Sequence, residues 1–308
     1  MPQNAMYEAP DHALTANESR WVCDSTVPSP GVCRRSQSPA TARVQMQTTV
    51  IQELGFKLKR GAIVLDLGCG NGAIVKEYRG LGCEAFGCDF AFKEGPDVES
   101  LHSNGLLRLI QRAPYRLPFP DDSFNVVISD QVFEHVKNYD ETLSEIRRVL
   151  KPEGISLHFF PSRYAPIEPH VYVPLATIIQ KRWWLAIWAI LGVRAPLQKG
   201  MSAREVTDAN HVYLTGHTNY LSRSAIERFV SRYFGDYGFC ESLFLKSSKR
   251  GRIIHKLSRF LPVFPLVYGM LRARALFFRK VYVLSAKYHA ITTPPSLPRL
   301  GVAYRVAQ

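Results

Sequence analysis

Residues 64–73 read Val64-Leu65-Asp66-Leu67-Gly68-Cys69-Gly70-Asn71-Gly72-Ala73, an apolar run that leads into alternating glycines. The pattern predicts a buried strand, a tight turn and then a helix over residues 73–79. Glycine suits the turn because it adopts positive φ without strain and has no Cβ to keep a ligand from the backbone. The helix presents free backbone N–H groups at its start. The stretch therefore predicts a nucleotide-binding unit.

Asp66 and the glycine spacing distinguish between two classes of nucleotide. A dinucleotide-binding turn has the pattern G-x-G-x-x-G and holds a pyrophosphate at the helix N-terminus. Here Gly72 comes one residue too early, and Asp66 stands two residues before Gly68. A carboxylate at that place repels a diphosphate and suits a cation or an ammonium group. We therefore rank a nicotinamide-dependent oxidoreductase behind an enzyme whose ligand carries positive charge.

Further motifs follow in the order found in one family. A strand expected over residues 84–89 ends at Asp89, an acid placed to bind both ribose hydroxyls. Then come L-P-F-P-D-D-S-F-N from Leu117, E-H-V from Glu134 and R-V-L-K-P-E-G from Arg148. Together with the glycine turn, these motifs resemble the class I S-adenosylmethionine (SAM)-dependent methyltransferases of the type 11 kind, over about residues 45–160.

The resemblance implies a Rossmann-like α/β fold with a seven-stranded sheet, SAM as the cofactor and methyl transfer as the reaction. It implies that Asp66, Gly68 and Gly70 surround the aminocarboxylate end of SAM, that Asp89 binds the ribose, and that residues 129–131 lie beside the methyl group. The cofactor-binding residues expected on this basis are Asp66, Gly68, Gly70, Gly72, Asp89, Ser129, Asp130 and Gln131.

One departure from the family concerns the adenine ring. Members usually have an Asp and a small residue four and three positions before L-P-F, where the carboxylate and the next backbone N–H meet the ring. This chain has Ala113 and Pro114 there. Alanine has no carboxylate and proline has no N–H. Either the local register differs, or Tyr115 and apolar packing hold the adenine.

The composition of the chain predicts its domain size, its N-terminal tail and the state of its cysteines. The 308 residues are 46% hydrophobic, enough for one enlarged domain with a full core. Residues 1–44 are rich in Pro, Ser, Thr and Asn, and we expect a disordered tail there. The six cysteines have no C-x-x-C pair, so we expect free thiols and no metal site. No signal pattern and no bilayer-length apolar run is present, which favours a cytoplasmic protein.

The charge of the chain is uneven. The net charge is +13, and residues 242–308 hold 13 Lys or Arg and no Asp or Glu. The last two core strands are expected over residues 237–245 and 280–287, within a C-terminal part that spans 221–308. This leaves residues 246–278 as a basic and apolar insertion. It suits peripheral binding to an anionic membrane, a partly buried cap with a solvated charged face, or nucleic acid.

A second insertion, residues 161–220, is expected to form an α-helical cap that binds the acceptor. Within it we expect an apolar helix over residues 174–191. The helix carries Trp184 and Trp188 at a spacing typical of core or lid packing. The core helix that follows begins at Ser222 or Ser224.

Three residues are candidate proton acceptors: His170, Glu168 and His135. Histidine titrates near neutral pH, and the pKa of a glutamate can be raised by its surroundings. Each has a structural alternative, because His135 at a helix entry can orient backbone and Glu168 can pair with Arg163. We favour His170 as the base.

The sequence therefore predicts a SAM-dependent methyltransferase that acts on a small-molecule or lipid-linked acceptor. The first alternative is a nucleic-acid methyltransferase, which the basic C-terminal part favours. The segment Ser129-Asp130-Gln131-Val132 argues against it, since base N-methylating enzymes usually carry Pro-Pro and an aromatic residue there. The second alternative is a non-catalytic, membrane-associated SAM-binding scaffold, which Ala113-Pro114 favours. The oligomeric state has no signature in the sequence.

Overall fold

The computed structural model describes residues 38–247 and 273–280. Its main sheet has seven strands in the order β3-β2-β1-β6-β7-β9-β8. The first five of these run parallel to one another, whereas β9 runs antiparallel to both β7 and β8. The predicted Rossmann-like seven-stranded sheet is therefore present. The strands are β1 (Ile63–Leu67), β2 (Glu84–Asp89), β3 (Leu107–Leu109), β6 (Phe124–Asp130), β7 (Leu150–Pro161), β8 (Asp236–Phe239) and β9 (Ala273–Arg279).

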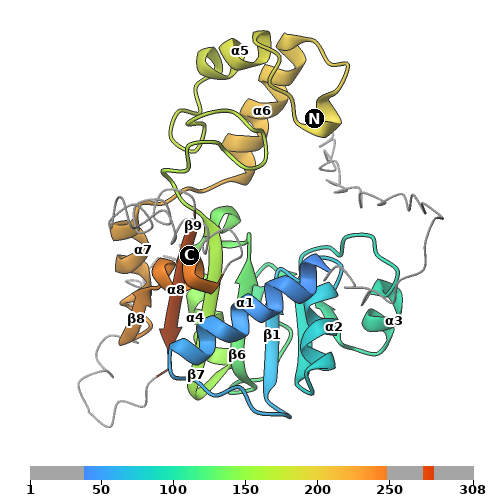
Figure 1. Ribbon diagram of the computed structural model, residues 1–308, viewed down its shortest axis with the longest axis vertical. Helices are drawn as coiled ribbons and strands as arrows, with labels where there is room; N and C mark the ends of the chain where they lie inside the picture. The colour runs from blue at the N-terminus through green and yellow to red at the C-terminus, as the bar shows by residue number, and fades with distance from the viewer. Residues whose placement is uncertain (1–37, 248–272, 281–308) are drawn as a thin grey trace, which may run out of the picture.

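Helices cover both faces of the sheet (Figure 1). Alternation along each strand sends Val64 and Val126 to one face and Leu65 and Val127 to the other. The first face packs against α1 (Pro39–Glu53), α2 (Ala73–Gly80), α3 (Val98–Ser103) and α8 (Glu241–Ser247); the second packs against α4 (Tyr139–Val149) and α7 (Arg223–Val230).

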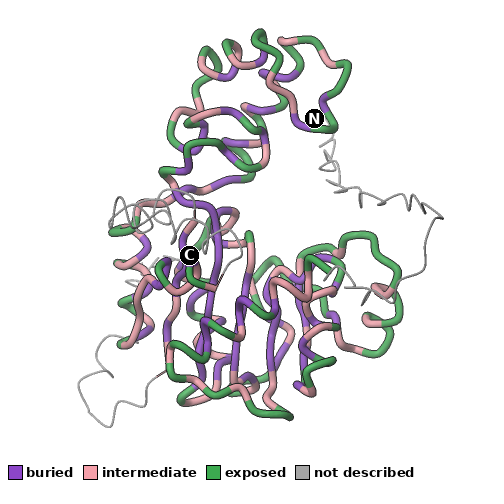
Figure 2. Tube along the Cα trace, in the orientation of Figure 1, coloured by how far each residue is buried: buried purple, intermediate pink, exposed green. Residues whose placement is uncertain are grey.

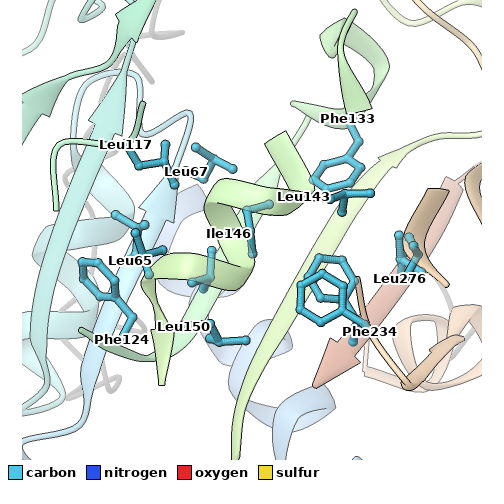
Figure 3. Close-up of a cluster of buried hydrophobic side chains, with 14 of the residues drawn as sticks. Leu65, Leu67, Leu117, Phe124, Phe133, Leu143, Ile146, Leu150, Phe234 and Leu276 are labelled. Carbon is cyan, nitrogen blue, oxygen red and sulfur yellow. The ribbon is translucent and has the colours of Figure 1, made fainter. Parts of the chain in front are cut away.

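The core on the second face is drawn in Figure 3, where α4 and Phe234 pack onto the strands. Leu143 and Ile146 on α4 are fully buried, one turn apart. Burying each such side chain contributes about 1.5–3 kcal/mol. Figure 2 shows that buried residues follow the strands along their length.

Helix α1 corrects the expected boundary of the N-terminal tail. The helix begins at Pro39, and the Ser38 hydroxyl accepts a hydrogen bond from the Thr41 N–H at 3.1 Å. Val44, Val50 and Ile51 are buried against the sheet. Residues 39–44 are therefore helical, because a serine cap and a proline at the first position start a helix that buries apolar residues further on. The rest of the expected tail, residues 1–37, lies outside the described residues.

The last two strands also differ from the prediction. Strand β8 ends at Phe239 and is followed by α8, so residues 241–245 are helical rather than extended. Strand β9 lies seven residues before the expected position. Arg274, which fell within the expected insertion 246–278, belongs to β9, where it is buried and pairs with Glu241 at 3.1 Å. Most of the proposed insertion 246–278, and residues 281–287, lie outside the described part of the chain.

Between β7 and α7 the chain forms a cap with two helices, α5 (Arg182–Ile190) and α6 (Ala203–His217) (Figure 1). A small cluster at its centre contains Val173, Leu185 and Leu214, against which Trp184 and Trp188 pack. The tryptophans are thus part of the cap core, as their spacing favoured. Helix α5 is shorter than the expected helix 174–191: Leu175 adopts a positive φ, which a helix does not allow, and α5 begins at Arg182.

Two further expectations concern helix starts and thiols. The hydroxyl of Ser222, not that of Ser224, caps α7 by accepting from the Ala225 N–H at 3.3 Å.

Cys69, Cys83, Cys88 and Cys240 are buried free thiols. Across residues 38–247 and 273–280, no helix has the length and apolar character needed to cross a bilayer.

Candidate functional site

The glycine turn has the backbone that the sequence predicted. Gly68, Gly70 and Gly72 have φ values of +77°, +52° and +75°. A Cβ on Gly68 would lie 2.3 Å from Val132 Cγ2, whereas a Cβ on Gly70 would meet its nearest neighbour, Lys93 Cδ, at 3.4 Å. Gly72 caps α2, and a Cβ there would lie 2.7 Å from Leu101 Cδ1. Gly68 and Gly72 are thus required for packing as well as for φ.

Three carboxylates lie at the ends of neighbouring strands beside this turn. Asp66 is on β1, Asp89 ends β2 and Asp130 ends β6. Burial, and then the negative charges of Asp130 and Asp89, raise the pKa of Asp66 well above its usual value. Arg43 of α1 forms an ion pair with Asp130. The arrangement favours a cation at this edge of the sheet, because a positive charge offsets both the burial and the mutual repulsion.

The carboxylate of Asp89 is held in place by the backbone. Its Oδ2 accepts from the Gly70 N–H at 3.0 Å, and its Oδ1 accepts from the Phe90 N–H at 2.7 Å. An ionised carboxylate has about four acceptor sites, so two bonds leave capacity for a ligand hydroxyl. Asp89 therefore connects the end of β2 to the glycine turn and can still accept from a ribose.

Of residues 129–131, Ser129 is buried inside the sheet and Gln131 is exposed. The buried Ser129 hydroxyl bonds to His158 Nδ1 at 2.7 Å, and Ser156 bonds to the other ring nitrogen at 2.6 Å. Burial lowers the pKa of His158 to about 3, so this histidine is neutral. The side chain of Ser129 is thus engaged inside the sheet. Gln131 is exposed with a φ of +58°, and its N–H donates to Phe159 at 2.8 Å.

The segment expected near adenine is a β-hairpin. Ala113 and Pro114 form its turn, between β4 (Gln111–Arg112) and β5 (Tyr115–Arg116). Tyr115 is largely covered, and its ring centroid lies 6.0 Å from that of Phe90, the residue after Asp89. Tyr115 thus lies next to the exposed ring of Phe90 beside the acid, and both alternatives from the sequence stay predictions.

In the cap, Glu168 orients His170. Glu168 is fully buried; its Oε1 accepts from His170 Nδ1 at 2.7 Å and from the Tyr220 hydroxyl at 2.5 Å. Burial raises the pKa of Glu168, but the bonds from His170 and Tyr220 outweigh burial and hold it below its usual value. Glu168 is therefore an ionised acceptor. Arg163 donates to the Tyr220 carbonyl at 2.7 Å, so the alternative pairing of Glu168 with Arg163 is wrong.

His135 meets this pair from the other side. It ends the short 3₁₀ helix η1 (Phe133–His135) that follows β6, and its Nδ1 lies 2.7 Å from the His217 carbonyl. A carbonyl accepts only, so Nδ1 carries the proton and Nε2 is free to accept. The ring centroids of His135 and His170 are 5.1 Å apart. His135 thus bonds to the backbone of a distant segment, and the structure places its ring beside that of His170.

Glu134 is a functional candidate that sequence reasoning missed. It is 1% exposed, and burial raises its pKa to about 8. Its carboxylate Oε1 lies 3.8 Å from His135 Nε2. The E-H-V motif contains Glu134, but its position in the sequence gives no indication that the cap brings His170 to the same place.

Comparisons with known proteins agree on one domain type. Residues 65–157 match the family model described as a methyltransferase domain. Sterol 24-C-methyltransferase ERG6B of Gibberella zeae is 34% identical over 103 residues, or 32% of this chain and 27% of that protein. The demethylmenaquinone methyltransferase of Geobacillus kaustophilus is 31% identical over 108 residues, or 33% and 46%. The chain thus aligns with less than half the length of these relatives.

Two solved structures that align with this chain have low sequence identity to it. The YcgJ protein of Bacillus subtilis aligns with a TM-score of 0.43 and 18% identity, over 79% of this chain and 99% of that one. A phosphoethanolamine N-methyltransferase 2 of Haemonchus contortus, in complex with SAM, aligns with a TM-score of 0.43 and 20% identity, over 76% and 52%.

Proposed function

Residues 65–157 form a class I SAM-dependent methyltransferase domain, and on that premise we propose that the chain transfers the SAM methyl group to a small-molecule or lipid-linked acceptor held under its cap. The observation that carries the proposal is the position of His170. This histidine is oriented by a buried carboxylate and lies next to η1, at the carboxyl end of β6.

The positive charge of SAM suits the buried carboxylates at this edge of the sheet. We place the ammonium of SAM near Asp66 and Gly68, because the buried acids favour a cation there. Asp89 takes the ribose, with its carboxylate already held by two backbone N–H groups. Asp130 and Gln131 lie beside the methyl group, and Phe90 with Tyr115 packs against the adenine.

Methyl transfer is an in-line displacement in which the acceptor atom attacks the methyl carbon and the bond to sulfur breaks. The donor is already activated by its positive charge, so the protein mainly positions the acceptor and removes its proton. His170 presents a free Nε2 for that proton, because its Nδ1 donates to Glu168. Ionised Glu168 stabilises the imidazolium that forms.

The surface of the cap favours an acceptor with an apolar part. Among the described residues, 14 large hydrophobic side chains are exposed, and 11 of them lie within residues 161–220. A groove of ≈ 390 Å³ between α5 and α6 combines apolar Trp183 and Ile190 with Arg204 and with an ion pair between Arg182 and Asp208. Apolar side chains beside a net positive charge suit a lipid or an anionic membrane surface. The relatives named above carry the names of sterol and demethylmenaquinone acceptors, which are apolar molecules.

The cofactor half of the proposal is tested by calorimetric titration with S-adenosylhomocysteine. We expect micromolar binding that is lost in Asp89→Ala and kept in Asp97→Ala, an exposed acid that pairs with Lys76 at 2.7 Å. Absence of binding to the unaltered chain would contradict a SAM site.

The acceptor half is tested with SAM that carries a labelled methyl group. We expect label in the organic phase after incubation with a lipid extract, and a loss of about 10²-fold or more in His170→Ala. Full turnover by His170→Ala would overturn its role as base. Label in RNA or DNA would favour a nucleic-acid methyltransferase, and cofactor binding with no transfer to any acceptor would favour a scaffold.

A further inference from the structure

Three side chains from two separate elements converge beside the acceptor site. Glu134 and His135 belong to η1, and His170 comes from the cap. One ligand atom of each lies within 4.8 Å of the ligand atoms of the other two. Residues 130 to 136 and the start of the cap must both be folded for this cluster to exist, which is why spacing along the chain gave no metal signal.

Both histidines are fixed with the same nitrogen free. His135 Nδ1 donates to the His217 carbonyl at 2.7 Å, and His170 Nδ1 donates to Glu168 at 2.7 Å. Nδ1 of each ring is therefore engaged, and Nε2 is the nitrogen left to bind a cation. Histidines that bind metals have this arrangement, with the second nitrogen donating to a carbonyl or a carboxylate.

Glu134 supplies an independent observation. Its side chain is 1% exposed, and neither carboxylate oxygen accepts a hydrogen bond from another residue in the described part of the chain. Its Oε1 points toward His135 Nε2, 3.8 Å away. A buried carboxylate is stable when a counter-charge or a hydrogen-bond donor satisfies it. An imidazole nitrogen that offers a lone pair donates no hydrogen bond to this carboxylate, whereas a cation between the three groups satisfies the carboxylate and both lone pairs.

We propose that Glu134, His135 and His170 bind one divalent transition-metal ion, with Zn²⁺ as the best match to two imidazoles and a carboxylate. Mg²⁺ and Ca²⁺ prefer oxygen ligands. Ligands at about 2.1 Å from a tetrahedral ion are about 3.4 Å apart, so the cluster closes by about 1 Å on binding.

Three protein ligands leave one coordination position open. That position suits an acceptor oxygen or nitrogen, whose proton is released more easily beside a metal ion. In this state His170 is a ligand, and it serves as the base only in the metal-free chain. The use of the ion in methyl transfer rests on the proposed function, but the binding of the ion does not.

The experiment is a titration of the full chain, stripped with a chelator, first with Zn²⁺ alone by calorimetry and then with Co²⁺ by visible absorption. We expect one equivalent to bind, with affinity at least 10-fold weaker in Glu134→Gln and in His170→Ala. His211→Ala is the matched control, a histidine on α6 outside the cluster. It should bind both ions as the unaltered chain does.

Binding of S-adenosylhomocysteine by the same variants reports whether they are folded. Failure of the unaltered chain to bind Zn²⁺ or Co²⁺ would overturn the proposal, as would equal affinity in Glu134→Gln and His170→Ala when both retain S-adenosylhomocysteine. Binding of Mg²⁺ in preference to Zn²⁺ would also overturn it. Zn²⁺ binding without any S-adenosylhomocysteine binding would support the metal site and contradict the proposed function, so the two fail separately.

Discussion

The sheet and the cap are stabilised in different ways. Both faces of the sheet carry large clusters of buried side chains, in which Phe124, Phe234 and Phe278 are almost wholly enclosed. The cap has one small cluster and exposes 11 large hydrophobic side chains. It rests on the β6 loop through polar contacts, including a bond from the Asn219 N–H to the Glu134 carbonyl at 2.6 Å. The cofactor end of the site is therefore rigid, whereas the acceptor end depends on a thin, largely polar junction.

The largest effect is expected from emptying each core in turn. Phe124→Ala removes a fully buried ring and should lower the free energy of unfolding by about 3–5 kcal/mol. Leu214→Ala empties the cap core, and we expect it to release hydrogen-exchange protection in residues 161–220 while the sheet stays protected. Denaturant unfolding and hydrogen exchange measure the two responses. Equal loss of protection in sheet and cap would show that they form one cooperative unit.

Two glycines of the turn after β1, Gly68 and Gly70, separate the effect of backbone φ from the effect of a steric contact at the cofactor end of the site. Gly68→Ala combines positive φ with a contact of 2.3 Å to Val132, and should cost about 2–4 kcal/mol of stability and the binding of S-adenosylhomocysteine. Gly70→Ala has the same φ problem but room for a Cβ, and should cost about 1–2 kcal/mol. Adding Val132→Ala should recover part of the loss in Gly68→Ala and none in Gly70→Ala. Recovery in neither variant would mean that the loss of stability in Gly68→Ala comes from its positive φ and not from the contact with Val132.

His158 makes the sheet sensitive to acid. Its folded pKa of about 3 lies below the ordinary value of 6.5, so the unfolded chain binds the extra proton between these values. Stability must then fall as the pH falls through this window, by up to about 1.4 kcal/mol per pH unit. His158→Gln removes this contribution, so its unfolding free energy should decline less steeply from pH 6.5 to 4. Identical slopes for the two proteins would assign the acid sensitivity to other groups.

The smallest effect on stability is expected at the outer face of the cap. Ile190→Ser changes a side chain that is 74% exposed and should alter the free energy of unfolding by less than about 0.5 kcal/mol. Sedimentation with vesicles that contain anionic lipid should nevertheless fall relative to the unaltered chain. Leu81→Ser is the matched control, because Leu81 is 52% exposed and follows α2, outside the cap. Equal sedimentation of both variants would argue against the cap as the lipid-binding face.

Local patterns decided which parts of the molecule could be predicted. The order of β1, its glycine turn and α2 follows from neighbouring residues, and the structure reproduces it. Strand β9 was misplaced because Arg274 and Arg279 look like surface charges, whereas their partners Glu241 and Asp236 lie more than 30 residues away in the sequence.

The acceptor end was harder to predict for a related reason. His170 and Glu168 are close in sequence, and both were named as candidates, but the pairing expected for Glu168 was with Arg163. The approach of His135 and Glu134 depends on how the cap returns to the sheet through Asn219 and His217. No periodicity or spacing encodes that return, since it is set by backbone contacts between distant segments.

The buried thiol of Cys69 gives the cofactor turn a built-in reporter. Burial, and then the charges of Asp66 and Asp89, raise the pKa of this thiol far above its usual value, so the closed turn does not react with alkylating reagents. The rate of alkylation at Cys69 therefore reports the opening of the turn to water. A bound cofactor that closes the turn would slow this reaction, and occupancy could be followed by mass spectrometry in a cell extract without any knowledge of the acceptor.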